Sequence, residues 1–226
     1  MSKPVVAGGI ACCLLTIAII VVVSVRFSIS AQESCTTDMF DDIMPSNFTL
    51  KEQYFTTRSR MKIFDLSGTE IGSFTTKPSF TQTVYSFHDL QDQVVAQAVK
   101  SAFSWTYRIG RCEKGVIGAG YELERIFFTI GTIEYNLRKN GVLIGNPAKK
   151  TWFTCKPDVI IESPNGTLIA TATRSCLGSF FVDSWSITNF DPANLENYVV
   201  GLIGYITTQQ ENMSSSSSSS SKKKKN

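Results

Sequence analysis

The segment LENYVVGLIGYI, residues 195–206, carries a single charged side chain, Glu196. Asp191 and Asn194 precede it beside Pro192, and these residue types are typical of the start of a helix. A helix that is apolar on most sides belongs in a core or in a membrane. Twelve residues rise only about 18 Å, which is too short to span a bilayer. The segment therefore predicts a helix buried inside a folded domain.

Upstream of this helix the sequence repeats one pattern: an apolar run meets a turn at glycine and continues into a second apolar run. Four copies lie at residues 61–74 (turn at Gly68), 107–120 (Gly115), 135–145 (Gly141) and 159–172 (Gly166), and a fifth at 84–99 has Asp92 in the place of glycine. Asn140-Gly141 and Asn165-Gly166 predict type I′ hairpin turns, because both central residues of that turn need a positive φ.

The five copies supply about ten strands, and alternating residues at 126–130 and 152–153 add a few more. Strands at short spacing joined by tight turns indicate a meander, a sandwich or a barrel. Closing so many strands into a barrel removes the exposed edges of the sheet. We therefore predict a mainly β domain over residues 54–208 with the C-terminal helix inside it. Residues 93–103 are compatible with either helix or strand.

Residues 4–26 follow a three-residue stub, 1–3, and are predicted to form one transmembrane helix. Apart from Arg26 the segment contains no charged residue, and about 20 apolar residues cross a hydrocarbon core of roughly 30 Å. The rival interpretation is a cleaved signal peptide, since Ser28 and Ser30 form a small-x-small site. The apolar region of a signal peptide usually has about 7–15 residues, so we favour a retained signal-anchor.

The sequence signals that indicate on which side of the membrane the β-domain lies are weak. Lys3 and Arg26 flank the anchor on opposite sides, so the positive-inside rule barely decides. Four cysteines outside the anchor could form two disulfides in three possible pairings, which suits an oxidising compartment; they are Cys35, Cys112, Cys155 and Cys176. Three glycosylation sequons point the same way; they begin at Asn47, Asn165 and Asn212. We predict a lumenal or extracellular domain, with the cytosolic face as the alternative.

The two flanks of the predicted domain are polar. Residues 27–53 are predicted to form a stalk, and the adjacent Asp41 and Asp42 have no other ligand type clustered beside them. Residues 209–226 are predicted to form a disordered tail. Their serine run, residues 214–221, and the four lysines that follow it contain no apolar residue to bury. The formal net charge is +3, and those lysines lie outside the predicted domain, so the domain lacks the basic surface of a nucleic-acid binder.

These hairpins and the buried helix resemble the tubby C-terminal-like superfamily, which includes tubby proteins, phospholipid scramblases and plant LURP-one-related proteins. IIESPNGTLIATATRSC, residues 160–176, is similar to the scramblase-type hairpin before the last strand. FFVDSWSITNFDPANLENYVVGLIGYI, residues 180–206, is similar to that strand and the central helix. FDLSGTEIGSF, residues 64–74, resembles the opening hairpin of the LURP-one-related proteins. The resemblance covers residues 54–206 and implies a closed β-barrel of about 12 strands around the C-terminal helix.

The chain departs from this family in several ways. Scramblases carry their membrane segment at the C-terminal end, whereas the predicted anchor here is N-terminal. Asp183, Asp191 and Glu196 fall where the scramblase acidic segment would lie, but they do not form the D-x-D-x-D-G pattern of a calcium loop. We therefore predict no metal site. Most domains of the family are cytosolic, which conflicts with the cysteines and sequons.

The sequence offers little for catalysis. Its one histidine, His88, stands beside Asp89 in a predicted turn, where a solvated side chain is expected rather than a catalytic base. No C-x-x-C pair exists for zinc, and Cys12-Cys13 lies within the anchor. GVIGAG, residues 115–120, lacks the features of a nucleotide-binding loop and is better explained by strand glycines. We predict no catalytic residue, no cofactor and no enzyme.

Basic residues in three loops remain as candidate ligands for lipid headgroups, because tubby domains bind phosphoinositides through Lys and Arg on the barrel rim. The competing interpretation is that these charges only solvate the loops. They are Arg108, Arg111, Lys114, Arg138, Lys139, Lys149 and Lys150. We predict a membrane-tethered, non-enzymatic β-domain that binds lipid headgroups or a protein partner. The alternative is a scramblase-like protein that moves phospholipids, although one short anchor offers no polar groove across the bilayer.

Overall fold

The computed structural model describes residues 44–52, 60–113, 116–118, 120–126, 132–150, 157–174 and 184–220. The predicted anchor at residues 4–26 lies outside this part of the chain, and no helix within it is long and apolar enough to cross a membrane. The strands are β1 (Asn47–Glu52), β2 (Arg60–Phe64), β3 (Glu70–Pro78), β4 (Gln82–His88), β5 (Val94–Ser101), β6 (Thr106–Glu113), β7 (Val116–Ile117), β8 (Tyr121–Ile126), β9 (Thr132–Lys139), β10 (Val142–Lys150), β11 (Pro157–Glu162), β12 (Leu168–Arg174) and β13 (Ser184–Asn189), and the helix is α2 (Asn197–Ser220).

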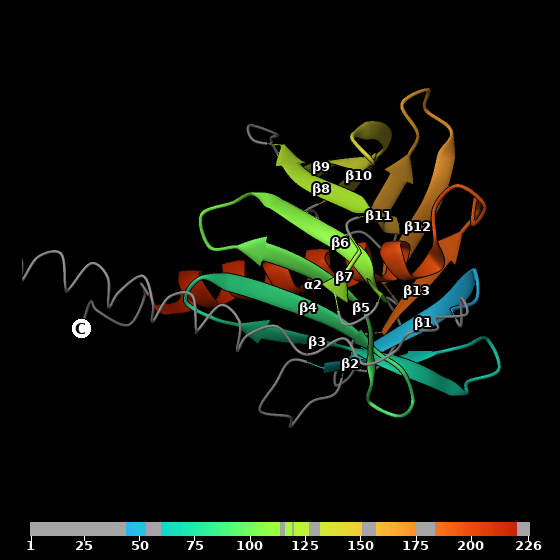
Figure 1. The fold of residues 1–226 in the computed structure, drawn as a ribbon, viewed down its shortest axis with the longest axis horizontal. Helices are drawn as coiled ribbons and strands as arrows, with labels where there is room; N and C mark the ends of the chain where they lie inside the picture. The colour runs from blue at the N-terminus through green and yellow to red at the C-terminus, as the bar shows by residue number, and fades with distance from the viewer. Residues whose placement is uncertain are drawn as a thin grey trace, which may run out of the picture.

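Twelve of these strands form a closed ring. Strands β1 to β6 and then β8 to β13 pair antiparallel in that order around the ring. The ring closes where β13 pairs with β1. The short β7 pairs with β6 outside the ring. The ring in Figure 1 has no unpaired edge, so the closed barrel of about 12 strands implied by the resemblance is confirmed.

Helix α2 fills the barrel, as the sequence predicts. Val199, Leu202, Ile203 and Ile206 are fully buried against the inner faces of the strands. Figure 1 shows the helix (red) passing behind β4, β5 and β6. The helix is longer than predicted, because it continues through Ser220 into the segment that the sequence assigns to a disordered tail. A buried helix removes the cost of nucleation, so serine and glutamine, which are tolerable helix formers, can extend it.

The barrel begins earlier in the chain than residue 54. Strand β1 lies within the segment predicted to be a stalk, and it joins the ring between β2 and β13. Phe48 and Leu50 point into the core, while Asn47 is exposed. Two apolar positions in a six-residue strand give a weak periodic signal, which is why the sequence does not separate β1 from the polar residues before it.

The hairpins explain the repeated pattern. Asn140 and Gly141 have φ values of 51° and 80°, as the predicted type I′ turn requires, and Asp92 takes the place of glycine at φ 62°. The type I′ prediction for Asn165-Gly166 is wrong. Gly166 alone of that pair has a positive φ, and its N–H donates to the carbonyl of Ser163 at 2.9 Å. Residues 163–166 therefore form a type I turn whose last residue, Gly166, is left-handed.

Pro164 accounts for this difference, since its ring fixes φ near −65° and favours the second position of a type I turn. The loops at residues 65–69 and 89–93 have the same hydrogen-bond pattern. Each of these three hairpins also shifts register where the strand meets the loop, as in a G1 bulge. Residues 94–101 form strand β5, which resolves the ambiguity of that segment.

The meander places alternate loops at opposite ends of the barrel. We call one end the helix-start end, where α2 begins; the loops there that the structure describes in full are residues 65–69, 89–93, 140–141, 163–167 and 190–196. We call the other the helix-exit end, where α2 leaves the ring; its described loops are residues 79–81 and 102–105. Any ligand must reach one of these ends or the outer wall, because side chains and α2 fill the interior.

Candidate functional site

The half of the interior nearest the helix-exit end is closed by aromatic side chains and their hydroxyl groups. Tyr135 donates to the side-chain oxygen of Gln210 at 2.6 Å, and the amide of Gln210 donates to Tyr107. Tyr205 lies 2.8 Å from the hydroxyl of Thr76. Burial raises the pKa of Tyr107 and Tyr135 above the usual value. These hydroxyls are therefore neutral at pH 7 and fix α2 in the barrel.

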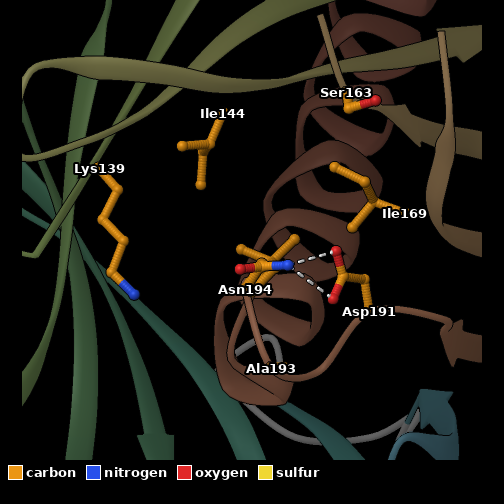
Figure 2. Close-up of a pocket in the computed structure, with 8 residues that line it drawn as sticks. Lys139, Ile144, Ser163, Ile169, Asp191, Ala193 and Asn194 are labelled. Carbon is orange, nitrogen blue, oxygen red and sulfur yellow. Dashed lines mark hydrogen bonds between the residues drawn. The ribbon is translucent and has the colours of Figure 1, made fainter. Parts of the chain in front are cut away.

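A pocket of about 360 Å³ opens at the helix-start end (Figure 2). Its floor is apolar and its rim is polar; the lining residues are Lys139, Ile144, Ser163, Ile169, Asp191, Ala193, Asn194 and Leu195. A second hollow of about 380 Å³ adjoins it and shares Ser163, Ile169 and Asp191. An apolar floor with a few polar groups on the rim is the usual character of a binding site.

Lys139 supplies the positive charge of the pocket. Tyr135, Leu137 and Lys139 alternate along β9, so Lys139 is the last inward-facing position of that strand, where the barrel opens to solvent. Its Nζ lies 3.5 Å from a carboxylate oxygen of Glu196 and 5.0 Å from the centre of the Tyr121 ring. The Lys139 side chain remains 37% exposed, so it can exchange these partners for a ligand.

Two carboxylates supply negative charge here: Asp191 lines the pocket, and Glu196 pairs with the Lys139 that lines it. Asp191 accepts two hydrogen bonds from the amide of Asn194, at 3.0 and 2.9 Å, which holds it beside the pocket (Figure 2). The second carboxylate oxygen of Glu196 is buried and has no hydrogen-bond partner among the described groups. The rim therefore presents one cation beside two anions, a mixture that suits a ligand carrying charges of both signs.

Buried amides hold the loop that carries Asp191 and Glu196. Asn189 donates to the carbonyl of Leu195 and to the side chain of Asn197, both at 2.7 Å. Asn197 in turn donates to the carbonyl of Met44 at 2.7 Å. The segment before β1 is thereby joined to residues 189–197 where α2 begins, so the rim of the pocket is organised before any ligand binds.

The basic residues proposed for lipid headgroups do not form one patch. Lys139 lines the pocket, while Arg111 faces inward with its guanidinium 5.3 Å from the Tyr198 ring. Arg108 and Arg138 lie on the outer wall on either side of Glu122, which offsets part of their charge. Lys149 is buried inside the barrel. Lys114 and the side chain of Lys150 lie outside the described residues.

Lys149 is predicted as a surface ligand for headgroups from its residue type, but it lies in the core. It is only 3% exposed, and its Nζ lies 5.1 Å from the centre of the Trp185 ring and 3.4 Å from the carbonyl of Thr207 in α2. A lysine in this position packs its aliphatic stem in the core and gives its charge to internal groups. It is therefore unsuited to contact a headgroup on the surface.

The other candidate residues have structural surroundings. His88 is buried, with Nε2 2.8 Å from the hydroxyl of Thr75 and Nδ1 3.3 Å from the carbonyl oxygen of Asp92. The sequence predicts a solvated side chain here, and that prediction is wrong. It lies on the face of β4 opposite the core residues Tyr85 and Phe87, where it contacts Thr75 of the adjacent strand. Among the described residues, no three His, Cys, Asp or Glu side chains could hold a metal ion.

The modification candidates are only partly described. Cys112 is buried and disulfide-bonded, and the other cysteines lie outside the described residues. Asn47 and Asn165 are exposed. The side chain of Asn212, the third sequon, is not among those described.

Sequence reasoning missed the pocket and a second surface feature. Asp191 and Asn194 are predicted as helix caps, Asp191 is also weighed against a calcium loop, and nothing local signals that they meet Lys139 from a distant strand. It also missed three exposed aromatic residues at the helix-exit end, Phe80, Phe103 and Trp105. Each stands among Ser, Thr, Ala or Pro, which is the available signal for an aromatic side chain outside the core.

No family model matches this chain. No curated protein matches it in sequence either. Among solved structures, an X-ray structure of a protein from Arabidopsis thaliana is similar to it, with a TM-score of 0.44, 14% sequence identity, and coverage of 74% of this chain and 96% of that chain. A likeness this distant carries no argument about function, so the proposals below rest on the geometry of the chain itself.

Proposed function

We propose that this chain is a membrane-tethered, non-enzymatic β-domain that binds lipid headgroups or a protein partner. The observation that carries the proposal is the filled barrel. Helix α2 and the aromatic core occupy the interior, so binding surfaces are left at the two ends and on the wall. A rigid scaffold with recognition at its loops is the usual arrangement in binding domains.

The two ends of the barrel suit different partners. The pocket at the helix-start end combines Lys139, which pairs with Glu196, with Asp191 above an apolar floor. Such a site fits a protein segment with one apolar side chain and charges of both signs. In this proposal the tether is the predicted helix at residues 4–26, which would keep the domain close to a bilayer.

The lipid-binding part of the proposal is tested by flotation. We expect a fragment of residues 44–226 to float with vesicles that contain anionic lipid, and to float less at high salt because screening weakens surface charge. A variant with Lys222–Lys225 replaced by serine is the control for the tail, since each lysine near an anionic surface contributes about 1 kcal/mol. Flotation that vanishes in this variant would assign lipid binding to the tail. Absence of flotation in the unaltered fragment would leave the protein partner as the proposed ligand.

The alternative function, movement of phospholipids between leaflets, needs a polar path that a single apolar helix does not provide. Purified full-length chain in vesicles with fluorescent lipid gives a direct test by dithionite reduction. We expect only the outer-leaflet fluorescence to be lost. Rapid loss of the inner-leaflet fluorescence would favour the scramblase-like function and count against a purely binding domain.

We further propose that the domain lies on the lumenal or extracellular side, with the cytosolic side as the alternative. Asn47 and Asn165 are exposed and stand in sequons. We expect endoglycosidase to increase the gel mobility of the expressed protein, and Asn165→Gln to remove one step of that shift. Unchanged mobility together with free thiols throughout would place the domain in the cytosol.

A further inference from the structure

The helix-exit end carries three aromatic side chains in solvent. Phe80 in the β3–β4 loop is 90% exposed, and Phe103 in the β5–β6 loop is 95% exposed. Trp105, at the end of the second loop, is 51% exposed. Aromatic side chains contribute most to stability when they are buried, so two almost fully exposed phenyl groups at one end of a closed barrel mark a candidate contact surface.

The two loops are fixed to each other and to their strands. The backbone N–H of Ala102 donates to the carbonyl of Thr81 at 2.8 Å, which joins the loops. The hydroxyl of Ser79 donates to the carbonyl of Gln82 at 2.8 Å, and that of Ser104 accepts from the N–H of Thr106 at 3.0 Å. The aromatic side chains are therefore held on an organised platform, which lowers the entropy lost when they bind.

The charge beside these aromatic residues is positive. Segments 77–82 and 100–106 contain Lys77 and Lys100 and no acidic residue, and Glu124 lies opposite Thr106 on β8. The Nζ of Lys100 lies 5.3 Å from the centre of the Trp105 ring, and the guanidinium of Arg125 lies 5.9 Å from it. A tryptophan between an apolar tip and lysine side chains is the arrangement found at the interface of a membrane with water.

The helix-start end differs in the sign of its charge. Its loops also expose apolar side chains, Leu66, Leu90 and Phe190, but each of these stands beside an aspartate, at positions 65, 89 and 191. Carboxylates are repelled by lipid phosphates, whereas the lysines of the helix-exit end are attracted to them. The charge distribution therefore selects one end of the barrel for a phospholipid surface.

We propose that the helix-exit end docks on a phospholipid bilayer. Phe80 and Phe103 enter the boundary between headgroups and acyl chains, Trp105 lies at the level of the headgroups, and Lys77 and Lys100 meet lipid phosphates. The proposal rests on the function proposed above, and it names the surface and the partner. With this end on the bilayer, the pocket at Lys139 faces away from the membrane and stays accessible to a protein.

The predicted tether permits this orientation. Residues 27–43 connect the predicted anchor to the first described residue, Met44, which lies at the helix-start end. Seventeen extended residues span at most about 60 Å. An eight-residue strand such as β5 is only about 27 Å long, so the connection can pass along the whole barrel. Either end can therefore reach the membrane, and the surface chemistry decides between them.

The test uses the full chain in vesicles whose acyl chains are brominated near the headgroup. Bromine quenches nearby tryptophan, and Trp185 is buried in the core. The emission of Trp105 is obtained as the difference between the unaltered chain and Trp105→Phe. We expect Trp105 to be quenched in the unaltered protein. The double variant Phe80→Ser/Phe103→Ser should lower the docked fraction about tenfold, since each phenyl group loses its apolar contact with lipid. Phe190→Ser, which removes an exposed aromatic at the opposite end, should leave the quenching unchanged.

The outcomes separate this inference from the function it rests on. Equal quenching of Trp105 in the double variant and the unaltered chain would overturn the docking surface. An unquenched Trp105, with the fragment of residues 44–226 still floating on vesicles, would overturn the docking surface and leave lipid binding intact. If Trp105 is unquenched and the fragment does not float, both are overturned. Unchanged thermal unfolding of the variants would show that the loop substitutions leave the barrel folded.

Discussion

Replacing Tyr205 by alanine is expected to lower the free energy of unfolding by about 3–5 kcal/mol, in the range for removal of a large aromatic side chain from a core. Tyr205 is fully buried in the middle of α2. Its ring stacks on Phe74, with centroids 5.4 Å apart, and meets the edge of Tyr85 at 6.1 Å. Denaturant unfolding followed by circular dichroism measures the loss directly.

The variant Tyr205→Phe provides the matched control. It keeps the ring and removes only the hydroxyl that lies 2.8 Å from Thr76 Oγ1, so we expect a loss of about 1 kcal/mol. A large difference between the two variants would show that the ring, as a filler between α2 and the strands, contributes most of the stability. If Tyr205→Ala cost no more than Tyr205→Phe, α2 would not be the central element of the core.

The parts of the fold that sequence predicts well are those set by local chemistry. The buried helix follows from residues 195–206 because nearly every side chain there is apolar. The hairpin at 140–141 follows from Asn-Gly because these residues tolerate a positive φ. Asp92 could be assigned a glycine-like place because aspartate is one of the few other residues that adopt this conformation.

The parts that sequence did not predict depend on contacts between distant segments. Strand β1 pairs with β13, whose paired residues follow 133 to 141 positions later, and nothing in the six residues of β1 encodes that partner. The pocket likewise joins Lys139 of β9 to the loop that precedes α2. A headgroup ligand must face solvent, whereas Lys149 faces the core. The direction of such a lysine depends on the register of its strand, and the register is set by the whole ring.

Replacing Gly72 by alanine is expected to destabilise the barrel by about 3 kcal/mol, at the upper end of the range for an overpacked core. A Cβ at this position would stand 2.4 Å from the carbonyl oxygen of His88 and 2.8 Å from the Phe87 ring. The oxygen belongs to the backbone of β4 and cannot rotate away, so β3 and β4 would have to separate. Thermal unfolding followed by circular dichroism should show the loss.

Gly120→Ala is the matched control, because a Cβ there would meet only the carbonyl oxygen of Ile109, at 4.0 Å. Its φ is not in the left-handed region, so restriction of the unfolded chain should make this variant about 0.4–1 kcal/mol more stable. Opposite signs for the same substitution would locate the cost at the contact between Gly72 and β4 rather than in the loss of glycine. A Gly72→Ala variant as stable as the unaltered chain would mean that β3 and β4 are less closely packed than their register requires.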